Sequence, residues 1–95
     1  MNSQQIQAIR ERYKNSLPEK AKVIAELIDA IEKPQPDAME NAYNVLHKLA
    51  GSSGMYGYDE IADLCRVAMS NARGNNASEL GSKLSQLHEL LENHA

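Results

Sequence analysis

The chain has 95 residues, of which 42% are hydrophobic and 24% are charged, and its net charge is −3. This length suits one packed domain spanning residues 1–95, and the composition is that of a folded protein. The acidic balance leaves no basic surface for nucleic acid, no apolar run is long enough to cross a membrane, and no signal-peptide core is present. We therefore expect a cytoplasmic protein that binds neither nucleic acid nor membrane.

The core has to be built from aliphatic side chains, because Phe and Trp are absent and the only aromatic residues are four tyrosines. Such a composition favours packed helices over a sheet. The single Cys65 cannot form an internal disulfide and lies on an apolar stripe, so we expect a core residue rather than a thiol nucleophile. One cysteine and three scattered histidines also lack the clustered spacing of a zinc site, and no metal is expected.

Two helices are predicted in the first third of the chain. Residues 3–14 carry apolar side chains at spacings of three and four and predict a short, weakly amphipathic helix. A second helix is expected from Ser16, a capping residue type, through Pro18 in its first turn to Lys33. Its stripe comprises Val23, Ile24, Leu27, Ile28 and Ile31. The Pro-Gln-Pro segment at 34–36 then predicts a rigid turn.

Three further helices follow. Asp37 is placed to cap a third helix, which ends where the glycine-containing segment 54–57 interrupts the chain. A fourth helix begins near Asp59 and ends at 73–76. Asn76 or Ser78 can cap the last helix, which runs to the C-terminus. The predicted buried stripes are Met39, Ala42, Tyr43, Leu46, Leu49, Ala50 and Ser53, then Ile61, Leu64, Cys65, Ala68 and Met69, then Leu80, Leu84, Leu87, Leu90 and Leu91.

Four substantial amphipathic helices joined by short links imply antiparallel neighbours. The predicted fold is therefore all-α, an antiparallel up-down-up-down four-helix bundle with a short additional N-terminal helix that covers one end.

The segment around His47 carries the strongest functional signal. On a helix Gly51 lies one turn beyond His47 on the same side, and a glycine there has no side chain to lean back over the imidazole. Lys48, Ser52 and the amides of the glycine-rich stretch are candidate donors to an anion on that ring. A lone helical histidine is usually a surface residue, and Gly51 alone could instead permit close helix packing. His88 and His94 have no such surroundings. We expect His88 to lie at the edge of a helix and His94 to lie in a frayed C-terminal tail.

The same residues resemble the histidine-containing phosphotransfer (HPt) domains of phosphorelays, whose motif reads roughly H-x-L-K-G-S-S-x-x-x-G-x-x-x-L-x-x-x-C. Matching residues are His47, Leu49, Gly51, Ser52, Ser53, Gly57 and Cys65, with Ile61 in place of the Leu. Ala50 stands where the family has a lysine, a lysine appears instead at Lys48, and Met69 replaces a frequent acidic residue. The departure at Ala50 leaves open which cation contacts a phosphoryl group.

The resemblance implies a phosphoryl carrier rather than an enzyme. His47 would accept a phosphoryl group from an aspartate of one receiver domain and return it to an aspartate of another. Lys48, Gly51 and Ser52 would support the phosphate site, and Tyr43, Met55 and Tyr56 are candidate docking positions for the receiver. The partner would supply Mg²⁺, so no cofactor is expected in this chain, which we expect to be a monomer. Tyr56 and Tyr58 could equally just cover the bundle end.

Two other functions remain as alternatives. A non-catalytic helical adaptor would keep the fold and bind a signalling partner without carrying phosphate. A kinase or phosphatase is disfavoured, because the glycine-rich stretch lacks the Gly-Lys-Ser/Thr ending and the preceding strand of a nucleotide loop. Met1 favours a standalone protein over a domain cut from a larger sensor kinase.

Overall fold

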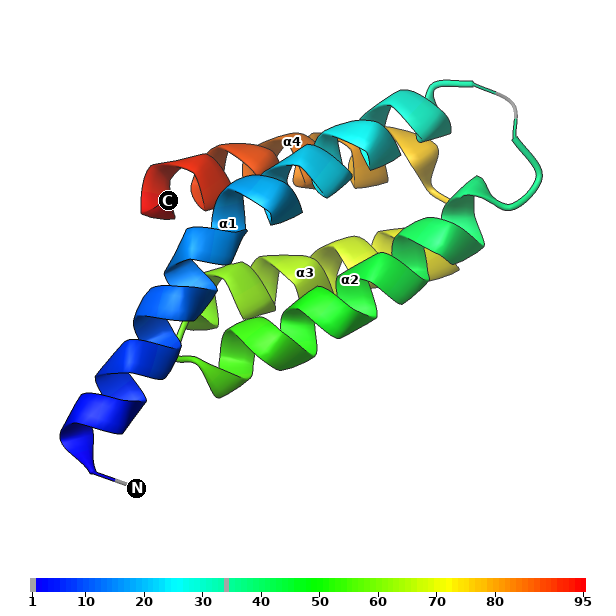
Figure 1. The fold of residues 1–95 in the computed structure, drawn as a ribbon. Helices are drawn as coiled ribbons and strands as arrows, with labels where there is room; N and C mark the ends of the chain where they lie inside the picture. The colour runs from blue at the N-terminus through cyan, green and yellow to red at the C-terminus, as the bar shows by residue number, and fades with distance from the viewer. Residues whose placement is uncertain (1, 34) are drawn as a thin grey trace.

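The computed structural model describes residues 2–33 and 35–95, and within these residues it contains four helices and no strand. They are α1 (Ser3–Ile31), α2 (Ala38–Met55), α3 (Asp59–Arg73) and α4 (Ala77–His94). Successive helices run in opposite directions, α1 lies beside α4, and α2 lies beside α3 (Figure 1). The predicted all-α, up-down-up-down four-helix bundle is confirmed. None of these helices is long and apolar enough to cross a membrane within the part of the chain described.

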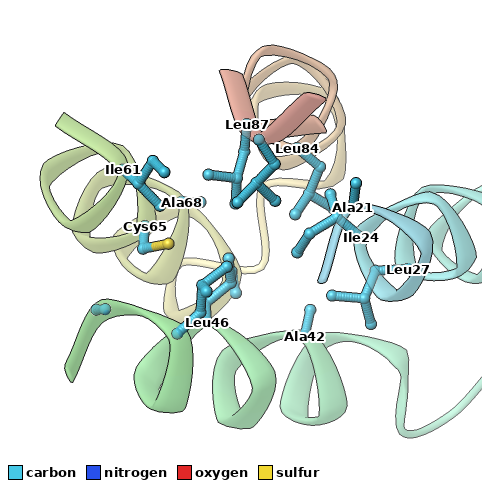
Figure 2. Packing of buried hydrophobic residues seen from close by; sticks show 14 of the residues in the cluster. Ala21, Ile24, Leu27, Ala42, Leu46, Ile61, Cys65, Ala68, Leu84 and Leu87 are labelled. Carbon is cyan, nitrogen blue, oxygen red and sulfur yellow. The ribbon is translucent and has the colours of Figure 1, made fainter. Parts of the chain in front are cut away.

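One hydrophobic core lies between the four helices, and each helix contributes to it (Figure 2). The predicted stripes of α2, α3 and α4 account for most of it, because side chains three and four positions apart share one helix face. Fully enclosed aliphatic residues from the four helices include Leu17, Ile24, Leu46, Ile61, Leu80, Leu84, Leu87 and Leu91. Val23, expected in the stripe of α1, is instead 38% exposed.

The prediction of a separate short N-terminal helix was wrong, because α1 is continuous from Ser3 to Ile31 with Pro18 inside it. Ser16 does not cap a helix start; its hydroxyl donates to the carbonyl of Tyr13 in the preceding turn. A proline lacks a backbone N–H and normally weakens a helix at that point. Here Leu17, just before the proline, and Ala21, one turn after it, are both buried, so tertiary packing holds the helix together across the proline.

The continuous α1 is much longer than its neighbours. At 1.5 Å per residue its 29 residues span roughly 43 Å, against roughly 27 Å for the 18 residues of α2. Its first turns extend beyond the ends of the other helices in Figure 1 and are mostly exposed. The start is closed by a capping box in which Asn2 and Gln5 each accept the other's backbone N–H, a signal that the sequence reading missed.

Two of the other predicted helix boundaries can be compared with the structure. Asp37 is the N-cap residue of α2, although its side chain makes no capping hydrogen bond. Asn76 caps α4 by accepting the backbone N–H of Glu79, whereas Ser78 lies inside the helix. Pro34 of the predicted turn at 34–36 lies outside the described residues.

Cys65 is fully buried on α3 within the core, as its apolar stripe predicted. Burial penalises the charged thiolate and raises the pKa of this thiol to about 12, against a smaller opposing effect of Arg66. A thiol that stays protonated at neutral pH is a poor nucleophile, so Cys65 acts as a small apolar side chain.

A set of hydroxyl groups ties α1 to the last turns of α2. The hydroxyl of Tyr13 is hydrogen-bonded to Ser52 Oγ at 2.8 Å and to Ser53 Oγ at 2.9 Å. The Tyr13 ring stacks on Tyr56, with centroids 4.5 Å apart, and lies 5.5 Å from the ring of Tyr58. Because Ser53 is completely buried, its hydroxyl needs this partner to offset the cost of leaving water. The Tyr13 contacts therefore fix the end of the helix that carries His47.

We predict that Tyr13→Phe lowers the free energy of unfolding by about 1–3 kcal/mol, the usual cost of leaving a buried hydroxyl without its partner. The measurement is urea unfolding followed by circular dichroism. Tyr56→Phe is the matched control, because the Tyr56 hydroxyl makes no hydrogen bond among the described residues. Equal effects of the two variants would contradict a role for the Tyr13 hydroxyl.

Candidate functional site

His47 lies near the middle of α2 and is exposed, while its neighbours Leu46 and Leu49 are buried. This placement follows from the helical repeat, since the buried stripe of α2 fixes which face turns toward water. The imidazole is thus held on a rigid helix rather than on a loop. A ring in this position can meet a second protein without any change in the fold.

Gly51 leaves open the space on the C-terminal side of His47. A Cβ built on Gly51 would have nothing within 4 Å, so packing against another helix does not require a glycine there. The close-packing explanation of Gly51 is therefore wrong. Gly54 differs, because a Cβ there would contact Ala62 and Arg66 of α3 at 3.8–3.9 Å. Gly57 has a φ of +85° in the turn after α2, a conformation that favours glycine.

Tyr43 closes the opposite, N-terminal side of His47. The two rings lie one helical turn apart, with centroids 6.3 Å apart and planes inclined by 21°. Arg73, the last residue of α3, holds Tyr43 from the outside: its Nη2 donates to Tyr43 Oη at 2.6 Å, and its Cζ lies 4.7 Å from the ring centroid. The imidazole therefore has one occupied flank and one open flank.

Lys48 and Ser52 lie toward α1, away from the Tyr43 side of His47. Both line a groove of about 450 Å³ between α1 and α2, together with Val23 and Leu49. The Ser52 hydroxyl is hydrogen-bonded to Tyr13 and donates weakly to the Leu49 carbonyl at 3.3 Å. These contacts give Ser52 a structural role, and a contribution of Lys48 or Ser52 to phosphate binding stays a prediction.

Met55 and Tyr56 end α2 on the side of the projecting turns of α1. Met55 is 78% exposed and lines a shallow pocket with Tyr56, Ile6 and Ile9. Tyr56 is half-buried and at the same time stacks on Tyr13, so it covers the bundle end as well as lining this surface. The docking of a receiver domain by Met55 and Tyr56 stays a prediction.

The other two histidines have different surroundings. His88 is half-buried on α4, with Nδ1 3.2 Å from a carboxylate oxygen of Glu92. His94 is not a frayed tail as expected, because α4 continues to it and its ring meets Tyr58 edge-on at 5.7 Å. Within residues 2–33 and 35–95, no group of three or more His, Cys, Asp or Glu side chains is arranged to hold a metal ion.

Comparison with known protein families bears directly on this arrangement. The family model described as Hpt domain matches residues 8–95, which is nearly the whole chain. The chain belongs to the Hpt domain family. No curated protein and no solved structure gives a significant match to it. The Hpt match begins inside α1 and covers the whole of α2, α3 and α4.

Membership in the Hpt family implies a phosphotransfer role in two-component signalling. Hpt domains are phosphoryl-carrier modules rather than catalysts, and they interact with receiver domains. In this Hpt domain the position of the expected lysine, Ala50, is only 6% exposed and packs in the core. A lysine placed there would have to extend past that packing to reach solvent, so an alanine fits the local burial.

The sequence did not indicate that two residues, Arg73 and Tyr13, contact the helix that carries His47. Arg73 was assigned only to the end of a helix, and it lies 30 residues from its partner Tyr43. Tyr13 was placed in a separate short helix, and it lies 39 residues from Ser52. Helical spacing predicts neighbours within one element and carries no signal for contacts at such separations.

We predict that Gly51→Ala raises the free energy of unfolding by about 0.5–1 kcal/mol, because alanine is the better helix former and the space beside it is open. Gly57→Ala serves as the contrast and should be destabilising, since its backbone has a positive φ. Urea unfolding of the two variants is the measurement. A destabilised Gly51→Ala variant would contradict the open flank.

Proposed function

We propose that His47 is the phosphoacceptor of this Hpt domain and that the domain relays a phosphoryl group between receiver domains. The observation that carries the proposal is the exposed imidazole with the open flank at Gly51. An in-line approach by an acyl phosphate needs free space next to the attacking nitrogen, and a rigid helix holds the ring in reach. The match of the His47 segment to the family motif supports the same residue.

In the proposed step the lone pair of His47 Nε2 attacks the phosphorus of an aspartyl phosphate on the donor receiver. The Nε2–P bond forms as the P–O bond to the aspartate breaks, and the electron pair of that bond stays on the released carboxylate. The reverse reaction at a second receiver regenerates the imidazole. Neutral imidazole is a competent nucleophile near neutral pH, and both phosphorylated forms are reactive enough for reversible exchange.

The rest of the chemistry is charge neutralisation and positioning, which dominate catalysis of phosphoryl transfer. We propose that the receiver supplies Mg²⁺ and that Lys48 is the cation that approaches the phosphoryl group from this chain. Lys48 lies about 100° around α2 from His47, so its long side chain would extend along the helix surface. No kinase or phosphatase activity of the domain itself is proposed.

The docking surface proposed for the receiver surrounds His47 on α2. Tyr43 and Lys48 flank the histidine, and Met55 and Tyr56 extend the surface toward α1. Met55 is the most exposed large apolar residue among residues 2–33 and 35–95, and an exposed apolar side chain near the proposed phosphoacceptor suits a transient interface. We propose that the chain is a monomer, which leaves this surface available to one receiver at a time.

We predict that His47→Gln abolishes phosphoryl acceptance. The protein is incubated with a phosphorylated receiver domain and Mg²⁺, and acid-labile, base-stable label on it is measured over time. His88→Gln is the matched control and should accept label at the normal rate, because His88 lies on α4 beside Glu92. Label on the His47→Gln variant would refute the assignment.

Gly51→Glu should keep the fold and slow transfer by more than about tenfold, since a side chain at this position leans back over the imidazole and its charge repels phosphate. Gly51→Gln has the same length without the charge and separates the steric effect from the electrostatic effect. Single-turnover transfer rates of the two variants and Gly51→Ala are compared. A normal rate for Gly51→Glu would show that the open flank is not the route of approach.

The adaptor alternative gives a different result in the same assay. An adaptor would bind the receiver with similar affinity in the wild-type and His47→Gln proteins, and neither would become labelled. Binding is measured separately by titration calorimetry. Labelled wild-type protein excludes the adaptor as the whole function.

A further inference from the structure

The contact between Arg73 and Tyr43 joins the end of α3 to the helix that carries His47. A single guanidinium makes two interactions with one phenol, since its Nη2 donates to Oη at 2.6 Å while its Cζ lies 4.7 Å from the ring centroid. Two simultaneous contacts restrict both the position and the tilt of the Tyr43 ring. Arg73 itself is exposed, and Tyr43 is half-buried.

The restricted Tyr43 ring is the nearest aromatic neighbour of the imidazole. Helical side chains lean toward the N-terminus, so His47 leans toward Tyr43, one turn earlier, and away from Gly51. The small angle of 21° between the two rings is that of an offset stack. An exposed histidine without such a neighbour would sample several staggered rotamers.

We propose that Arg73 is a positioning residue for phosphoryl transfer: it fixes the Tyr43 ring, which in turn limits the rotamers of the His47 imidazole and leaves the other flank of the ring, at Gly51, open to the phosphoryl group. This inference rests on the proposed function of His47. Arg73 acts through Tyr43 and needs no contact with the phosphoryl group. The role differs from the docking role expected for Tyr43, because positioning changes the rate within the complex rather than its formation.

A purely structural role for Arg73 would make its loss destabilise the fold. The packing of α2 on α3 comes from buried residues such as Leu46, Ile61 and Cys65, and an exposed cation–aromatic contact adds little to stability. Loss of the guanidinium should therefore leave the fold intact. The expected effect falls on the orientation of the imidazole and on the rate.

The test compares Arg73→Met, Tyr43→Ala and the double variant, with Arg66→Met as the matched control on the same helix. Arg66 is exposed and pairs with Asp63 on α3 itself. Two quantities are measured: the single-turnover transfer rate at saturating phosphorylated receiver, and the NMR shifts of the His47 ring protons. Saturation removes any contribution of receiver affinity, and the ring-proton shifts report how the Tyr43 ring lies against the imidazole.

Arg73→Met should lower the saturated rate by about three- to tenfold, in line with the release of a few extra rotamers. Its His47 shifts should move toward those of Tyr43→Ala, and the double variant should be no slower than Tyr43→Ala alone. Arg66→Met should change neither quantity. Arg73→Lys keeps the charge without the planar fork and should recover only part of the rate.

An unchanged saturated rate and unchanged His47 shifts in Arg73→Met would overturn the inference, as would effects that multiply in the double variant. The first result would assign Arg73 to the surface alone, and the second would make it a separate contact to the receiver. Should Tyr43→Ala fail to fold, Tyr43→Leu takes its place as the ring-free variant. Failure of the proposed function is distinct, because it appears as label on His47→Gln, whatever Arg73 does.

Discussion

The burial of one face of α2 determines what the opposite face presents. Ala42, Leu46, Leu49, Ala50 and Ser53 are all less than about a tenth exposed, and these five residues fix the rotation of the helix about its axis. His47 and Gly51 then lie outside the core together. A rotation by even one residue position, about 100°, would bury the histidine or turn a leucine outward. The imidazole is thus presented to solvent by the hydrophobic effect acting elsewhere on the same helix.

Contacts on both sides of His47 along α2 complete this arrangement. At its C-terminal end the Tyr13 hydroxyl joins Ser52 and Ser53 to α1, and one turn before His47 the Arg73 guanidinium holds Tyr43 from α3. The core sets the rotation of α2, while these polar contacts set the finer position of its side chains. Polar groups suit this purpose because hydrogen bonds are directional and packing among aliphatic side chains is less so.

The sequence predicted the helices whose apolar stripes are strong and local, and it predicted that His47 is exposed with an open flank at Gly51, as the structure shows. It failed at α1, where Ser16 and Pro18 form a typical helix start. Tertiary packing overrides this local signal because Leu17 before the proline and Ala21 after it are both buried, which no pattern within one helix reveals. Arg73 was missed for the same kind of reason, since its contact to Tyr43 exists only when α2 and α3 lie together.

The central claim is that this helix face presents one nitrogen, Nε2 of His47, to a phosphoryl donor. The most direct measurement is residue-level localisation of the phosphate after reaction with a phosphorylated receiver, by ³¹P and ¹⁵N NMR of the labelled protein. The account predicts a single phosphohistidine, at His47 and on Nε2. Phosphate on His88 or His94, or on Nδ1 of His47, would contradict it.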